Sequence, residues 1–325
     1  MTPNDPDSPT PGISRRSLLA SAGVAAGSAV IANVIPAFGA QAAPAAQPQQ
    51  PVVPPDPSAV PGIGSEALAP RSPFERPSLT PVNVTSGPAL CPLQDLSGTI
   101  TPSDLVFQRH HNGIPTIDPA RHTLTIHGLV DRPLTFTVAD LQRFPAVTRI
   151  HFLECAGNGR SAYRSPKPDM TPQQIDGLTS NCEWTGVELK TLLRECGARS
   201  EARWLLAEGN DAARLARSIP MEKALDDALV VWGQNGEPLR PANGYPVRLL
   251  LPGFEGNANV KWLRRIELGR EPWMFRDETS KYTDPLPNDT ARQFSFLLDA
   301  KSIITSPAFP SRLTGPGWWP IRGVA

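Results

Sequence analysis

The chain has 325 residues, of which 40% are hydrophobic, and its 31 basic and 31 acidic side chains leave no formal net charge. This length and composition allow a sizeable core in one large or two moderate domains, and the dispersed basic residues exclude the basic face that nucleic acids require. The cysteines are too few and too scattered for a disulfide framework, and none has zinc or haem spacing. They are Cys91, Cys155, Cys182 and Cys196. A metal would therefore come with a cofactor that brings most of its own ligands.

The N-terminal residues predict export. Residues 14–19 (SRRSLL) contain two adjacent arginines, and no charged side chain follows Arg16 until Asp56. Small residues stand at positions 40 and 42. We interpret residues 1–42 as a twin-arginine signal peptide for export to the periplasm. An uncleaved membrane anchor is the alternative, although glycine and serine dilute the apolar segment. Residues 43–73 are rich in Pro, Gln and Ala and predict a solvated linker.

From residue 74 onward, the pattern mixes strands with short helices. Alternating or continuous apolar runs predict strands at 124–130, 149–154, 204–207, 228–232, 247–251 and 260–268. Capping and spacing signals predict helices over 137–144 and 187–196, the second ending at Gly197, and Asn235 with Gly236 predicts a hairpin turn. Helices placed irregularly among strands favour an α+β fold over a doubly wound parallel sheet.

Residues 151–160 (HFLECAGNGR) place Cys155 in an unusual setting. Ile150, Phe152 and Leu153 indicate the end of a buried strand, and the following turn has almost no side chains, so a large ligand can approach the backbone. Arg160 adds a positive charge, which lowers the pKa of a nearby thiol and favours the metal-binding thiolate. A buried structural cysteine beside an ordinary turn is the alternative.

Four polar clusters stand in predicted loops: 107–111 (FQRHH), 208–211 (EGND), 243–248 (NGYPVR) and 259–262 (NVKW). Each alone fits an ordinary turn or solvated loop. Together they offer Arg109, Arg248 and Lys261 for an anionic group, with Asp211 and Asn243 as hydrogen-bonding partners for a heterocycle. A pterin that carries a phosphate needs this mixture.

In their order and approximate spacing, these motifs resemble the sulfite oxidase family of molybdenum enzymes, over about residues 102–299. Residues 109–115 (RHHNGIP) and 278–282 (ETSKY) are similar in particular to the molybdenum subunits of sulfane dehydrogenases. The resemblance implies a sulfite oxidase-type molybdopterin fold of mixed sheets with short helices over residues 74–299. It also implies that residues 300–325 begin an immunoglobulin-like dimerisation domain. Such a domain has about 100 residues, so we expect it to be truncated here and Trp318 and Trp319 to be exposed.

The resemblance also assigns roles to single residues. Cys155 would be the one protein ligand of molybdenum, and Arg109, Arg160 and Tyr282 would line the substrate face as catalytic residues beside it. The residues implied to hold the molybdopterin are Phe107, Gln108, Arg109, His110, His111, Asp211, Asn243, Arg248, Asn259, Val260 and Lys261. Two departures stand out: Asn243 occupies the place of a histidine in animal sulfite oxidases, and Thr179 stands near the place of an aromatic pocket residue. A wider pocket favours a substrate bulkier than sulfite.

The expected activity is oxidation of sulfane sulfur on a sulfur-carrier protein in a thiosulfate oxidation pathway. The chain has no haem-attachment motif and no dinucleotide fingerprint, so a separate c-type cytochrome would accept the electrons. A direct sulfite dehydrogenase is the alternative within the family, and a non-catalytic cofactor-binding protein is the alternative outside enzymes. We expect no nucleic-acid partner, no stable membrane insertion, and a homodimer or heterotetramer at full length.

Overall fold

A computed structural model describes residues 70–325, apart from residues 76, 83–86 and 167–169. The predicted signal peptide, residues 1–42, and nearly all of the predicted linker, residues 43–73, lie outside the described residues. Within the described part, no helix is long and apolar enough to cross a membrane.

An antiparallel five-stranded sheet contains the strand that ends directly before Cys155. Its strands in spatial order are β10 (Glu237–Pro238), β9 (Leu229–Gln234), β6 (Thr179–Glu188) and β5 (Ala146–Glu154), and β11 (Arg248–Leu250) also pairs with β9. The predicted hairpin turn joins β9 to β10, with Asn235 at φ 51° and Gly236 at φ 76°. These left-handed angles are what a tight two-residue hairpin requires.

The strand before Cys155 lies at the edge of this sheet, and this position corrects one prediction. Ile150 and Phe152 are 56% and 47% exposed, whereas Leu153 is 6% exposed. The prediction that all three are buried is wrong for the first two. Successive side chains of a strand point to opposite faces, and only one face of β5 is covered.

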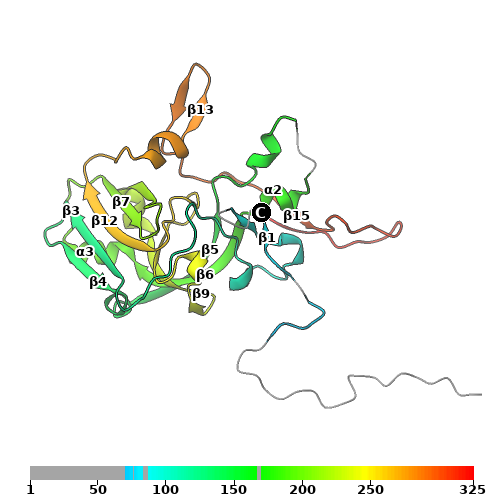
Figure 1. The fold of residues 1–325 in the computed structure, drawn as a ribbon, viewed down its shortest axis with the longest axis horizontal. Helices are drawn as coiled ribbons and strands as arrows, with labels where there is room; N and C mark the ends of the chain where they lie inside the picture. Colours follow the sequence, from blue (N-terminus) through cyan, green and yellow to red (C-terminus); the bar gives the residue numbers. More distant parts are fainter. Residues whose placement is uncertain (1–69, 76, 83–86, 167–169) are drawn as a thin grey trace, which may run out of the picture. The chain divides into compact units, whose positions relative to one another are not determined.

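A second sheet mixes parallel and antiparallel pairs. Its order is β4 (Leu134–Thr137), β3 (Thr123–Gly128), β12 (Leu263–Gly269), β7 (Trp204–Gly209) and β8 (Ala216–Pro220), and only β3 and β12 are parallel. The predicted strand 260–268 begins later than expected because Trp262, just before β12, has a left-handed φ of 53°. Mixed sheets confirm the α+β prediction (Figure 1).

The α-helices are short: α1 (Val138–Leu141), α2 (Pro172–Asp176), α3 (Leu189–Cys196) and α4 (Met221–Asp226). Thr137 and Asp140 form the predicted capping box of α1. Helix α3 ends at Gly197 as predicted, with φ 67°, but it starts two residues late because Val187 and Glu188 pair within β6. Leu189, Leu192 and Leu193 then face the main core.

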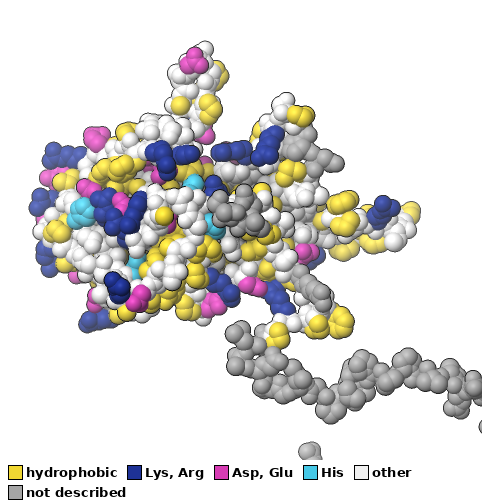
Figure 2. Space-filling model, in the orientation of Figure 1, with side chains coloured by type: hydrophobic (Ala, Val, Ile, Leu, Met, Phe, Trp, Pro, Cys, Tyr) yellow, Lys and Arg dark blue, Asp and Glu magenta, His cyan; other side chains and the backbone are white. Residues whose placement is uncertain are grey.

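Three two-stranded ribbons complete the described chain: β1 (Thr80–Pro81) with β2 (Ala89–Leu90), β13 (Asp284–Leu286) with β14 (Thr290–Arg292), and β15 (Ile303–Ser306) with β16 (Arg322–Val324). The β13 and β15 hairpins extend outward from the sheets in Figure 1. Hydrophobic side chains are exposed along the C-terminal hairpin (Figure 2), and Trp318 and Trp319 are both exposed, as predicted.

Candidate active site

The predicted loops meet around one cavity, which holds about 700 Å³ of space outside the protein atoms, part of it open to solvent. The predicted residues that line the cavity are Phe107, Arg109, His110, His111, Cys155, Asp211, Asn243, Arg248, Asn259, Lys261 and Tyr282. Gln108, Arg160 and Val260 are not among the lining residues; Arg160 is exposed and Val260 is fully buried.

Backbone contacts fix the position of Cys155 at the end of β5. Its N–H donates to the carbonyl of Leu178 (3.0 Å), and its carbonyl accepts from the N–H of Asn158 (2.8 Å). The N–H of Gly256 donates to the carbonyl of Glu154 (2.6 Å). A Cβ on Gly256 would lie 2.7 Å from that carbonyl oxygen and 3.2 Å from the Cα of Cys155. The loop before β12 can approach the cysteine this closely because residue 256 is glycine.

Burial raises the pKa of the Cys155 thiol. The N–H of Gly157, which donates to Sγ (3.4 Å), lowers this pKa, as does Arg109 and then Arg160, but together they do not reverse the effect of burial. Arg160 thus lowers the pKa of the thiol, as predicted, but its effect is smaller than that of burial. Coordination to a metal cation would deprotonate the thiol directly.

Two cationic side chains of the cavity, the buried Arg248 and the partly buried Lys261, connect the predicted loops. Arg248 donates to the carbonyls of Asn243 (2.8 Å) and Asn259 (3.0 Å), and burial lowers its pKa to about 10. Lys261 Nζ donates to the carbonyls of Arg109 (2.9 Å) and Ala242 (2.8 Å). Burial, with Arg248 beside it, lowers the pKa of Lys261 to about 7. A bound anion would favour the charged form of this lysine.

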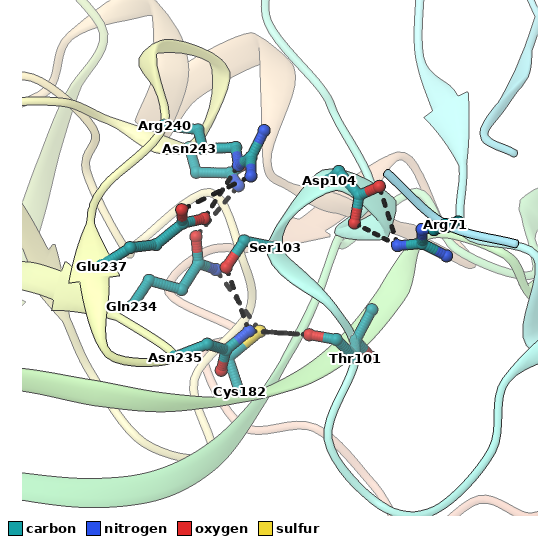
Figure 3. Close-up of polar contacts among 10 residues, drawn as sticks. All are labelled: Arg71, Thr101, Ser103, Asp104, Cys182, Gln234, Asn235, Glu237, Arg240 and Asn243. Carbon is teal, nitrogen blue, oxygen red and sulfur yellow. Dashed lines mark hydrogen bonds and ion pairs between the residues drawn. The ribbon is translucent and has the colours of Figure 1, made fainter. Parts of the chain in front are cut away.

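A chain of buried side chains orients Asn243 (Figure 3). Its Nδ2 donates to Oε1 of Gln234 (3.0 Å), and Nε2 of Gln234 donates to Sγ of Cys182 (3.3 Å). Burial raises the pKa of Cys182 to about 12, so this thiol stays neutral. Cys182 thus acts as a structural acceptor behind the cavity, in contrast to Cys155, which lines it.

Neutral donors and acceptors line the side of the cavity that Tyr282 occupies. The hydroxyl of Tyr282 lies 3.4 Å from Nε2 of His111, and burial raises the phenol pKa to about 12. Burial lowers the pKa of His110 to about 4 and also lowers that of His111. At neutral pH both imidazoles are therefore uncharged and the phenol keeps its proton, while Arg109 carries the positive charge.

The cavity also contains residues to which the sequence assigned no role, including Trp262, Gly256 and Asn257. Trp262 was visible in the 259–262 motif, and its Nε1 donates to the carbonyl of Pro241 (2.9 Å). Gly256 and Asn257 come from the glycine-rich loop between β11 and β12, whose approach to Cys155 only the tertiary structure reveals.

Unpaired polar atoms show that the cavity fits a polar cofactor. Among the described residues, His110 Nδ1, Arg248 Nε and Asn257 Oδ1 are buried without a hydrogen-bond partner, and all three side chains line the cavity. Buried polar atoms of this kind need a partner. Donors, an acceptor, three cationic side chains and one thiol together suit an anionic heterocycle that carries a thiophilic metal.

Comparisons with known proteins agree with this chemistry. Residues 111–275 match the family described as oxidoreductase molybdopterin binding domain. The NADH nitrate reductase 2 of Phaseolus vulgaris is 33% identical over 266 residues, which is 72% of this chain and 30% of that protein. The NADPH nitrate reductase of Phytophthora infestans is 33% identical over 238 residues, which is 70% of this chain and 24% of that protein.

A solved structure is also similar. The crystal structure of the sulfane dehydrogenase SoxCD from Paracoccus pantotrophus has a TM-score of 0.74 and 40% sequence identity, covering 77% of this chain and 66% of that chain. The chain thus spans less than a third of the two nitrate reductases and just under two thirds of the SoxCD chain.

The protein belongs to the oxidoreductases with a molybdopterin-binding domain, in the sulfite oxidase family. Its fold is that of the molybdenum subunit in the SoxCD structure, and its cofactor is molybdenum-molybdopterin, as predicted.

Proposed function

We propose that this protein is a periplasmic sulfane dehydrogenase, exported by the twin-arginine route, that oxidises sulfane sulfur held on a carrier protein. One observation carries the proposal: Cys155, Arg109 and Tyr282 line the same cavity. The 40% identity to SoxCD, a sulfane dehydrogenase, supports this substrate. The chain would serve as a SoxC-like subunit, pass electrons to a SoxD-like c-type cytochrome, and assemble as a homodimer or heterotetramer.

The balanced reaction adds oxygen from water to sulfur. For a carrier persulfide, R–S–S⁻ and water give R–S–SO⁻, two protons and two electrons, and the electrons leave singly to the cytochrome. When bound, the molybdenum cofactor supplies oxygen-atom transfer and two-electron redox chemistry. Cys155 would be its protein ligand. The other residues of the chain position the cofactor and the substrate.

The side chains of the cavity have distinct tasks in this proposal. Arg109 attracts and orients an anionic sulfur group. Tyr282, which keeps its proton at neutral pH, donates a hydrogen bond to an oxygen that gains negative charge. Arg248 and Lys261, both largely shielded from water, would hold the anionic parts of the pterin. Arg160 is exposed and does not line the cavity. Its predicted contact with the substrate therefore stays a proposal.

A paired substrate assay tests the function. The purified, molybdenum-loaded protein is mixed with cytochrome c and either a persulfide-bearing carrier protein or sulfite. We expect reduction of the cytochrome with the carrier persulfide and little with sulfite. Faster reduction with sulfite would instead identify a direct sulfite dehydrogenase. Nitrate with a reduced dye is the control suggested by the nitrate reductase relatives. No turnover with any substrate, despite bound pterin and molybdenum, would identify a non-catalytic protein.

The Cys155→Ser variant tests the assigned ligand. We expect turnover to be lost while the protein stays folded and retains pterin, because the remaining cavity contacts are unchanged. Cys196→Ala is the matched control, since Cys196 lies in the main core, outside the cavity. Molybdenum and pterin analysis, circular dichroism and the cytochrome assay give the readouts. Full activity of Cys155→Ser would contradict the assignment.

A further inference from the structure

The residue that carries the cavity's phenol stands outside both sheets. Tyr282 follows a π-helical turn, η6 (Asp277–Lys281), at the base of the β13 hairpin in Figure 1, and its N–H donates to the carbonyl of Asp277 (3.1 Å). Within this turn Thr279, Ser280 and Lys281 are exposed, whereas Asp277 and Glu278 are buried. The position of the phenol therefore depends on how the two buried acidic residues are held.

Strand β8 holds both of them. Glu278 accepts from Nε of Arg217 (2.9 Å), from Nη2 of Arg217 (3.2 Å) and from the N–H of Ser218 (2.7 Å). Asp277 accepts from the N–H of Ala216 (3.4 Å). The side chains of Arg217 and Glu278 are 0% exposed. A fork of two parallel bonds to a carboxylate fixes orientation as well as distance.

Arg217 also contacts the phenol ring itself. Its guanidinium carbon lies 4.8 Å from the ring centroid of Tyr282 and 5.7 Å from that of Phe296. A guanidinium over an aromatic face is attracted to it, and the interaction strengthens away from water. The Arg217 side chain thus contacts both the turn that precedes Tyr282, through Glu278, and the ring of Tyr282 itself.

Stability alone gives a weak reason for this ion pair. Replacing a buried ion pair with apolar side chains is often neutral or stabilising, because both charges must be removed from water. Here Nη1 of Arg217 is also buried without a hydrogen-bond partner among the described residues. The ion pair between Arg217 and Glu278 is better explained by a role in fixing the position of the turn that precedes Tyr282.

We propose that Arg217 and Glu278 are positioning residues that fix the hydroxyl of Tyr282 at the substrate side of the cavity. This inference rests on the proposed function for the role of Tyr282 in turnover. Neither residue lines the cavity. They act through the ring and the turn rather than on the substrate.

A double-mutant cycle tests the coupling. Arg217→Met combined with Glu278→Leu removes both charges and keeps apolar volume, and Arg217→Lys keeps the charge but loses the fork. We expect either change to lower kcat/KM about tenfold when Tyr282 is present and less than about twofold in the Tyr282→Phe background. Equal losses in both backgrounds would overturn the proposal. The control is Arg149→Met with Glu188→Leu, an ion pair (2.8 Å) between β5 and β6.

A second readout is independent of activity. The chain has three tyrosines, so 3-fluorotyrosine gives three fluorine resonances in the molybdenum-loaded protein, and the Tyr282→Phe variant assigns one of them. We expect the Tyr282 resonance to shift or broaden in the Arg217 variants and to stay unchanged in the control. An unchanged resonance would overturn the positioning role. If wild-type protein oxidises no sulfur compound, the proposed function fails, while this readout still tests the positioning of Tyr282.

Discussion

At the scale of single residues, burial raises the pKa of all four cysteine thiols, so another property must distinguish their roles. Burial raises the pKa of Cys91, Cys182 and Cys196 to between about 11 and about 12, and none of these thiols lines the cavity. Burial also raises the pKa of Cys155, yet its sulfur borders the cavity beside Arg109. Access to a bound metal, more than the protonation state of the free thiol, therefore distinguishes Cys155.

His122 predicts a pH dependence of stability. Nε2 of this buried imidazole lies 2.9 Å from the carbonyl oxygen of Leu263, and burial lowers its pKa below the ordinary 6.5. The unfolded chain binds a proton at a higher pH than the folded protein, so stability is present above about pH 6.5 and declines as pH falls below it. We expect urea unfolding between pH 7.5 and 5 to show a shallower decline for His122→Gln. Identical slopes for variant and wild type would contradict this.

At the scale of elements, Gly256 allows the loop between β11 and β12 to pack against the end of β5, where Cys155 follows. Gly256→Ala would place a Cβ 2.7 Å from the carbonyl oxygen of Glu154, so the loop or the end of β5 must move. We expect the variant to fold but to lose most of its molybdenum and its turnover, because the ligand is displaced. Gly317→Ala is the control, since its Cβ meets only Trp319 Nε1, at 3.8 Å. Full molybdenum content in Gly256→Ala would show that the loop adapts.

Edges and ends of elements are where sequence predictions and structure diverge. The apolar residues Ile150, Phe152 and Leu153 indicated a buried strand before Cys155. The burial of Ile150 and Phe152 depends on whether another element covers β5, which the local pattern does not encode. Likewise, the apolar run from residue 260 continued the pattern of β12, but Trp262 takes a left-handed conformation before the strand. The capping box of α1 and the glycine end of α3 were predictable because their signals are local.

At the scale of the whole molecule, the cavity brings together positive side chains from separate segments of the chain. Arg248 and Lys261 both line it, and burial lowers the pKa of each, which means that removal from water disfavours their charged forms. A ligand that binds only the folded state stabilises it by mass action.

Removal of the cofactor should therefore lower stability. We expect protein made without molybdopterin to unfold about 5 to 10 °C below the loaded protein, as measured by calorimetry. In Lys261→Met this difference should shrink, because the variant loses a charge that the cofactor would neutralise. Equal midpoints for loaded and cofactor-free wild type would argue against the cavity as the cofactor site.

The sequence by itself determined the motifs and their order, and the resemblance of these motifs to the sulfite oxidase family predicted a molybdopterin enzyme. The pattern of strands and short helices predicted the α+β fold, because such signals are local in the chain. Only the tertiary structure decided which residues face the cofactor. It placed Arg160 outside the cavity, brought Gly256 against Cys155, and set Arg217 behind Tyr282. These relations join residues that are distant in the chain, and they arise from the pairing and packing of separate strands and loops.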